Sequence, residues 1–333
     1  MALQTTGSAG LSDEMKTFYD RMLLERTVPK LIHNMFGQPK RIPRNGGKTI
    51  EWRKFSALST ATTPLVEGTL YTDLQDLTVT AITGTVAQYG AAVGFSDYVD
   101  VVAIDNLLSE TTKILAEQAS QTIDELIRDA LVLGTTINYG NAATGTVDIA
   151  ANDDFANMDG AGSTQTGGSL VDIRTIVLDM ELNRARRING FYQAITHPRV
   201  MFDIQSTTEW REHQLYNSTN RIAQGGLGNM VSGPSPVGEI YGVQFWVTDV
   251  AKVKTGAGAS GIDVYTMLVF GEDAFGTVHL AEGNLQTIYK PLGSAGTADP
   301  LDQQQTMGWK VMFGTKILQQ DFMLRYECAV STS

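Results

Sequence analysis

Residues 106–133 read NLLSETTKILAEQASQTIDELIRDALVL, and this run decides how the rest of the chain can be arranged. Apolar side chains recur in it every three or four positions, and neither glycine nor proline occurs between residues 95 and 133. This pattern predicts an amphipathic helix that begins after an N-cap at Asp105 and stops at Gly134. At 1.5 Å per residue the helix would be roughly 40 Å long. We expect a spine, because such a helix is too long for a crossover in a small compact domain.

Two details of the predicted spine follow from its spacing. Asp124 and Arg128 lie four positions apart and are a predicted i,i+4 charge pair. The predicted apolar stripe, which we expect to face the rest of the chain, consists of Leu108, Leu115, Ala119, Ile123, Leu126 and Ala130.

An extended hairpin is predicted before the spine. The sequence NGG at residues 45–47 is a strong turn signal, and residues 49–55 alternate between apolar and charged side chains as strands do. Residues 77–89 predict a long second strand whose apolar positions change phase near its middle. Such a change predicts a bulge, or a strand that passes from one environment to another. An isolated hairpin is marginally stable in water, so we expect a partner surface to hold this arm.

A shorter helix is predicted near the N-terminus. Residues 1–11 are small and polar, Ser12 is a plausible N-cap, and Pro29 stops the run that follows. The apolar residues at helical spacing are Met15, Phe18, Tyr19, Met22 and Leu23. We expect this amphipathic helix to lie against another surface.

Beyond the spine the sequence predicts a mixed α+β lobe. Residues 135–168 are rich in small and polar residues and predict a surface loop or weak hairpin. A second helix is predicted from Ser169, which forms a capping-box-like pair with Asp172, to Ile188, where Asn189-Gly190 ends it. Strands are predicted at residues 191–196, 240–248 and 265–270. Three further strands, at residues 285–289, 309–316 and 322–328, are expected to pair back onto the spine.

Charge and cysteine content exclude several classes of protein. The 333 residues contain 25 Lys and Arg against 36 Asp and Glu, a net charge of -11. A protein whose main partner is nucleic acid needs a cationic face, which this balance argues against, although a container for DNA stays possible. The single cysteine, Cys328, excludes an intrachain disulfide and fits a reducing cytosol. Because no secretory signal and no run of roughly 20 apolar residues occurs, we expect a soluble protein.

Motifs for catalysis or metal binding fail on inspection. Residues 46–49, GGKT, match the end of a phosphate-binding loop, but Ile42 stands where its first glycine belongs and a strand is predicted to follow. The four histidines have no metal-ligand spacing, and one cysteine cannot supply a thiolate set. Asn152-Asp153-Asp154 predicts a solvated acidic loop, because calcium ligands would be out of register. We therefore predict no enzyme, no metal and no cofactor.

Local motifs carry a resemblance to a known family. The run FYDR at residues 18–21, LER at 24–26 and GGKTIEWRKF at 46–55 resemble the opening of major capsid proteins of tailed bacteriophages, typified by the N4-like podoviruses. Further similar segments, which extend the resemblance over nearly the whole chain, are TPL at 63–65, EG at 67–68, QYG at 88–90, FSD at 95–97, YGV at 241–243, VFG at 269–271 and AFG at 274–276.

The resemblance implies an α+β fold of the Hong Kong 97-like type. It implies an N-terminal arm with a short helix, an extended loop formed by a β-hairpin, a peripheral domain with the spine helix, an axial domain, and return strands of the peripheral domain. The corresponding ranges are residues 1–44, 45–93, 94–190, 191–283 and 284–333.

The implied function is a major capsid protein that self-assembles into the icosahedral shell around the double-stranded DNA genome of a tailed phage. Implied partners are other copies in pentamers and hexamers, portal, scaffold or decoration proteins, and packaged DNA without sequence-specific contact; no membrane is implied. The implied location is the virion capsid, assembled in the bacterial host cytoplasm. Two alternatives stay open: an encapsulin-like nanocompartment shell, and a β-rich binding module or hydrolase.

We expect the assembly interface to include the extended loop lying across a neighbouring copy. Basic residues of one strand would meet acidic partners there, since the chain has a surplus of Asp and Glu. The candidate interface residues are Phe18, Tyr19, Arg21, Lys48, Trp52, Arg53, Lys54 and Glu67.

Overall fold

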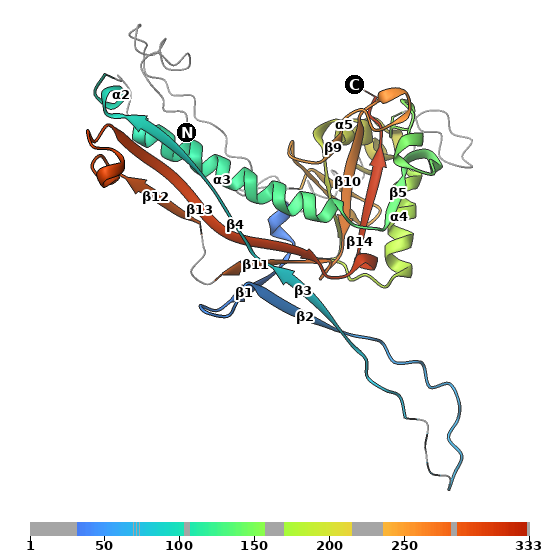
Figure 1. Ribbon diagram of the computed structural model, residues 1–333. Helices are drawn as coiled ribbons and strands as arrows, with labels where there is room; N and C mark the ends of the chain where they lie inside the picture. Colours follow the sequence, from blue (N-terminus) through green and yellow to red (C-terminus); the bar gives the residue numbers. More distant parts are fainter. Residues whose placement is uncertain are drawn as a thin grey trace, which may run out of the picture.

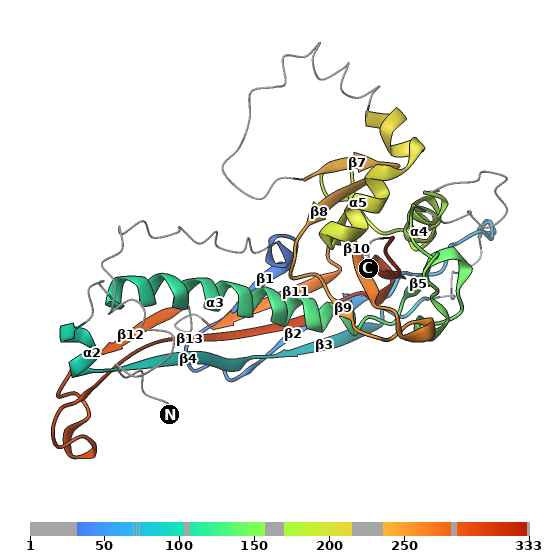
Figure 2. The ribbon, with the colours of Figure 1, turned by 90° about the horizontal axis from the view of Figure 1, so that it is seen from above.

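The computed structural model describes residues 32–331 except 69, 71, 73, 103–106, 157–169, 215–235 and 281–284. The predicted N-terminal helix, with Phe18, Tyr19 and Arg21, therefore lies outside the described residues. Figure 1 shows a long layer in which α3 lies along twisted strands, a second lobe at one end of that helix, and a hairpin that projects away from both. Figure 2 shows the same lengthwise arrangement from above.

The long layer consists of one helix on a five-stranded sheet. The helix is α3 (Leu107–Val132), preceded by the short α2 (Asp97–Val102), and it ends beside the predicted stop at Gly134. The strands are β1 (Gln38–Ile42), β11 (Phe275–Leu280), β13 (Gln304–Ile317) and β12 (Gln286–Lys290), in that order, with β4 (Ala87–Ser96) also paired to β13. Residues 306–310 of β13 pair with β12 and β4 at once, so β4 lies on the opposite edge of β13 from β12.

A buried stripe joins α3 to β13. The prediction is confirmed for Leu115, Ala119 and Ile123 and in part for Leu126, which is partly buried against the same cluster. It missed Ile127 and Leu131, which are fully buried, whereas Ala130 is only partly buried; the side chain of Leu108 lies outside the described residues. The buried positions follow the i,i+4 row, which winds slowly around a helix and brings its end against the second lobe. The cluster also contains Met307, Trp309, Val311 and Phe313 of β13, and Ile195, Leu268 and Phe270 of that lobe.

The second lobe is a seven-stranded sheet with two helices. Its strands are β5 (Ile137–Tyr139), β14 (Met323–Cys328), β10 (Val264–Phe270), β6 (Tyr192–Thr196), β8 (Val243–Val247) and β7 (Gly238–Ile240), in that order, with β9 (Val253–Lys254) beside β10. The helices are α4 (Val171–Leu182) and α5 (Pro198–Ser206). The prediction that residues 322–328 return to the spine is wrong, because β14 pairs with β10 and β5 inside this sheet.

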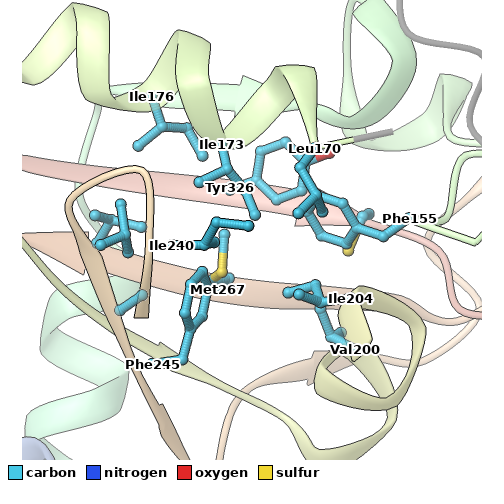
Figure 3. Packing of buried hydrophobic residues seen from close by; sticks show 14 of the residues in the cluster. Phe155, Leu170, Ile173, Ile176, Val200, Ile204, Ile240, Phe245, Met267 and Tyr326 are labelled. Carbon is cyan, nitrogen blue, oxygen red and sulfur yellow. The ribbon is translucent and has the colours of Figure 1, made fainter. Parts of the chain in front are cut away.

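The seven-stranded sheet is covered on both faces. Every residue of β10 is buried, and alternate side chains enter different clusters: Tyr265, Met267 and Val269 in one, Leu268 and Phe270 in the other. Successive side chains of a strand point to opposite faces, so one face packs on α4 and α5 and the other on the end of α3. Figure 3 shows the first cluster, to which α4 contributes Ile173 and Ile176, α5 contributes Val200 and Ile204, and the sheet contributes Phe245, Met267 and Tyr326.

Two element boundaries in this lobe differ from the prediction. The helix α4 ends at Leu182 and not at Ile188, because Arg184 adopts a left-handed conformation (φ 56) and the Ala185 N–H bonds the Met180 carbonyl, as in a Schellman cap. The predicted strand 240–248 is two strands, β7 and β8, since Tyr241 and Gly242 both have positive φ and form a two-residue hairpin turn.

The projecting hairpin consists of β2 (Thr49–Phe55) and β3 (Val79–Thr85), paired in antiparallel register from Thr49–Thr85 to Phe55–Val79. The predicted change of phase in residues 77–89 is confirmed. The strand divides at Val86, where β3 of the hairpin gives way to β4 of the five-stranded sheet. The Val86 N–H bonds the Lys48 carbonyl at 2.9 Å and closes the base of the hairpin.

Candidate assembly surface

The projecting hairpin carries an exposed apolar surface at its far end. In the described part of residues 56–78, outside its three gaps, the chain has no helix and no strand. Its large apolar side chains are more than half exposed, reaching 84% at Leu70 and 82% at Leu74. We call this part the loop tip; its exposed apolar residues are Leu58, Leu65, Val66, Leu70, Leu74 and Leu77, and Phe55 and Val79 continue them onto the hairpin. Several large exposed apolar residues on one segment point to a contact site for another chain.

The base of the hairpin is anchored within the chain by one tryptophan. Trp52 is 7% exposed and packs in a small cluster with Ile42 and Val278. Two glycines make room for its ring, since a Cβ at Gly84 or at Gly276 would lie 2.6 Å from ring atoms of Trp52. The structure therefore places Trp52 in an intrachain core, with Ile50 and Ile82 of the same hairpin beside it.

The other predicted interface residues lie on the surface of the same hairpin. Lys48, Arg53 and Lys54 are all exposed. Lys48 lies at the base of the hairpin, whereas Arg53 and Lys54 lie near the end of β2 from which the loop tip begins. Arg53 forms an exposed ion pair with Glu51 at 3.0 Å, which contributes little to stability. Glu67 is exposed within the loop tip. Four of the predicted residues therefore lie on β2 or directly before it, and Glu67 lies in a different segment.

A groove that the sequence did not reveal lies on the five-stranded sheet. Met307, Trp309 and Val311 of β13 are packed in the α3 cluster, so the alternate residues Gly308 and Lys310 face the opposite side. A groove of about 460 Å³ opens among β4, β13 and β12 there. It is lined by Gln88, Tyr89, Gly90, Ala91, Ala92, Ile288, Lys290, Thr306, Gly308, Trp309 and Lys310.

Small residues form the floor of this groove and lysines form its rim. Gly90, Ala92 and Gly308 carry little or no side chain, and a Cβ at Gly308 would lie 2.7 Å from the Ala91 carbonyl. Lys290 and Lys310 come from β12 and β13. The available sequence signal was the alternation of small residues in β4 at positions 90, 92 and 94, which has no meaning until the pairing with β13 is known.

A second cavity, of about 410 Å³, lies beside β5, α4 and β14. The Tyr326 hydroxyl donates to Asp172 at 2.6 Å, and Asn138 donates to Asp179 at 2.8 Å. Burial raises the pKa of Tyr326 well above 10, and the nearby Asp172 raises it further, so this phenol stays a hydrogen-bond donor. These carboxylates are engaged in holding the lobe together.

The acidic loop is not solvated as predicted. Asp153 and Asp154 are buried, and both carboxylates accept hydrogen bonds from nearby chain. Asp153 accepts from the Asn141 amide at 2.9 Å and from the Ala150 N–H at 2.7 Å. Short-range capping of backbone N–H groups is why an Asn-Asp-Asp sequence can be buried. Within the described ranges, no group of three or more His, Cys, Asp and Glu side chains could hold a metal ion, and no helix is long and apolar enough to cross a membrane.

Comparisons with known proteins give a consistent result. A family described as phage capsid protein matches residues 79–327. Among solved structures, the capsid of Ralstonia phage GP4 is similar with a TM-score of 0.69 and 14% identity over 98% of both chains. The cyanophage Pam1 capsid asymmetric unit gives 0.68 and 13% over 100% of this chain and 99% of that one. The capsid of cyanophage P-SCSP1u gives 0.62 and 15% over 96% and 94%. No curated protein matches the chain.

Proposed function

This chain belongs to the phage capsid protein family and is a major capsid protein of a tailed phage, and we propose that its copies form an icosahedral shell around double-stranded DNA. The fold is the α+β, Hong Kong 97-like fold of tailed-phage capsids. Copies of such a protein associate with one another into a shell, and its place is the virion capsid. The grouping with N4-like podoviruses stays a prediction.

We divide the chain into an arm, an extended loop, a peripheral domain and an axial domain. The projecting hairpin supports the loop assignment for residues 45–86, whereas residues 87–93 belong to β4 and we assign them, with α3 and the five-stranded sheet, to the peripheral domain. The seven-stranded sheet supports an axial domain. Because β5, α4 and β14 pack in that sheet or on it, we assign residues 137–182 and 323–328 to the axial domain as well.

One observation carries the proposal: the loop tip exposes six large apolar side chains on a segment with no core of its own. At about 25 cal/mol per Å² of apolar surface, leaving them in water is a substantial cost that burial against another copy removes. A shell satisfies this need for every subunit, since each copy both offers a tip and receives one.

The groove on the five-stranded sheet is our candidate receiver for the loop tip of the next copy. Its apolar floor suits leucine side chains, and its rim carries Lys290 and Lys310. The tip carries Glu67 and Asp76, both exposed. Opposite charges at the rim would fix the register of the contact more than its strength.

Deleting residues 56–78 tests this function. A Gly-Ser link between β2 and β3 keeps the Trp52 anchor, so we expect a folded, soluble subunit that forms no shells. The matched control is the pair Thr60→Ser and Thr62→Ser, which keeps every apolar residue of the tip and should assemble normally. Shells of normal size from the deletion variant would refute the role of the tip.

The contents of purified particles separate the shell functions. We propose that particles from infected cells contain nuclease-protected double-stranded DNA, and that a portal and scaffold or decoration proteins join the shell in the host cytoplasm. A protein cargo in place of DNA would favour the encapsulin-like alternative. Saturable ligand binding or turnover by a monomer would favour a binding module or hydrolase.

A further inference from the structure

A short segment at the start of the described chain lies where the two sheets and the spine meet. This segment, residues 32–36, includes the single turn η1 (His33–Met35). Ile32 is 5% exposed and belongs to the cluster formed by α3, β13 and the seven-stranded sheet. Phe36 packs edge-on against Trp246 and at a tilt against Phe270 of that sheet, with ring centroids 5.3 Å and 5.4 Å apart. In Figure 2 the segment is the blue turn between α3 and β8.

One carboxylate of the spine holds this segment. The His33 backbone N–H donates to Oδ1 of Asp124 at 2.9 Å, and Nδ1 of His33 lies 2.7 Å from Oδ2. His33 and Asp124 are 0% and 1% exposed. The predicted pair between Asp124 and Arg128 is therefore wrong. A buried carboxylate needs hydrogen-bond partners beside it, and the N–H and ring of His33 supply them. Arg128 instead donates to the Val250 carbonyl at 2.7 Å.

The two bonds use both oxygens of Asp124 and fix the segment in orientation as well as position. The other ring nitrogen of His33, Nε2, is buried and has no hydrogen-bond partner in the described part of the chain, where Asp124 is thus the polar contact of this side chain. Further along, polar bonds also tie the spine to the second lobe: Arg128 donates to the Val250 carbonyl, Asp129 pairs with Lys252 at 3.2 Å, and Arg325 donates to the Val132 carbonyl. The packed apolar contact between spine and lobe includes Ile32 and Phe36.

We propose that residues 32–36 are a wedge that sets the angle between the five-stranded and seven-stranded sheets, with Asp124 as its positioning residue, and that this angle selects shell curvature. The inference rests on the proposed function. Packed interiors do not deform continuously, so a wedge of fixed size holds one angle and its loss allows others. If the angle within an elongated subunit changes, the directions of its contacts with neighbouring copies change as well. The curvature of the closed shell changes with them.

Shell diameter distinguishes this role from ordinary stabilisation. Asp124→Asn keeps the shape of the side chain and weakens the hold on His33, and Phe36→Leu shrinks the wedge while staying apolar. We expect both variants to form particles whose diameters, measured by electron microscopy, are shifted or broadened relative to the wild type. The matched controls are Glu125→Gln, an exposed neighbour on α3, and Phe202→Leu, 60% exposed on α5; both should keep the wild-type diameter.

Measuring the Tm of each variant together with its shell diameter separates a loss of stability from a change of curvature. Folded variants with a lower Tm but shells of wild-type diameter would overturn the wedge proposal and leave a purely structural role. If both variants fail to fold, a reconstruction of wild-type shells tests the proposal instead. Among subunits in which the angle between the two sheets differs, we expect the contacts of Phe36 to differ as well. Unchanged Phe36 contacts in subunits with different angles would contradict the proposal. A wild type that forms no shells would instead refute the proposed function.

Discussion

The ammonium group of Lys40 lies 5.2 Å from the centroid of the Trp52 ring and donates to the Glu51 backbone carbonyl at 2.7 Å. The two residues connect β1, an edge strand of the five-stranded sheet, with β2 of the projecting hairpin. Lys40 thus adds a cation–π contact to the packing of this ring with Ile42 and Val278. The hairpin is rigid at its base and unsupported at its tip, which is the arrangement that a contact arm requires.

Replacing Trp52 should detach the base of the hairpin. Truncating a buried tryptophan typically costs about 3–5 kcal/mol, and here the loss falls on a small cluster that unfolds locally. We expect Trp52→Ala to make residues 49–85 sensitive to limited proteolysis while the near-UV circular dichroism of the remaining core persists. Trp52→Phe, which keeps an aromatic ring beside Gly84 and Gly276, should be cleaved much more slowly. Equal protection of all three proteins would show that Trp52 is no anchor.

Charge reversal at the groove should prevent assembly, because the rim then repels the acidic loop tip. We expect Lys290→Glu with Lys310→Glu to leave a folded subunit that sediments as small species. Adding Glu67→Lys and Asp76→Lys should restore part of the shell yield. The control is Lys316→Glu, exposed on the same strand but outside the groove. Normal shells from the double reversal would exclude the groove as the receiver.

The lone cysteine allows this contact to be mapped by disulfide formation. Cys328 is fully buried, and burial raises the pKa of its thiol well above 9, with nearby carboxylates such as Asp203 raising it further. It should therefore resist maleimide labelling until the protein unfolds. Because Cys328 does not react in the folded protein, a chain that carries both Val66→Cys and Ala92→Cys should form disulfides between copies in shells through the two new cysteines. The pair Val66→Cys and Leu178→Cys, with Leu178 exposed on α4, should not.

Stability should decline in mild acid through His197. Its Nδ1 accepts the Arg199 N–H at 3.2 Å and caps α5, which requires the neutral ring. Burial lowers the pKa of His197 below its ordinary 6.5, and the charge of Arg199 lowers it further, while Asp249 opposes this. The unfolded chain therefore takes up a proton near pH 6.5 before the folded chain does. The stabilisation is complete above pH 6.5 and is lost as pH falls through the folded pKa.

Denaturant titrations between pH 5 and 7.5 check this direction. His197→Asn can cap the same helix without titrating in this range, so it should lose less stability in acid than the wild type. The pKa of His279 is also lowered, by burial and by Arg41. Because both proteins contain His279, its effect on the change of stability with pH is the same in both. Parallel pH profiles for the wild type and His197→Asn would contradict the capping argument.

The sequence predicted elements whose signals are local. The spine ends beside Gly134, β2 occupies the predicted residues 49–55, and the phase change marks the boundary between β3 and β4. Helix and strand periodicity depends on residues that are close together in sequence. These elements could therefore be predicted without knowing the fold. The family resemblance rested on similarly local motifs.

What the sequence did not predict depends on contacts between distant residues. Asp124 looked like a surface charge until His33, 91 positions away, was found beside it. Residues 322–328 read as a strand, but only the pairing with β10 assigns them to a sheet. The groove combines residues of β4, β12 and β13, and the interior position of Trp52 depends on Val278. Which surface is free for assembly is therefore a property of the folded chain.

Electron microscopy of the purified wild-type protein tests the central claim most directly. Our account predicts closed shells of uniform diameter, in which the loop tip of each copy lies on a neighbour. A monodisperse, folded monomer at every concentration, with the leucines of residues 56–78 packed against its own chain, would contradict it.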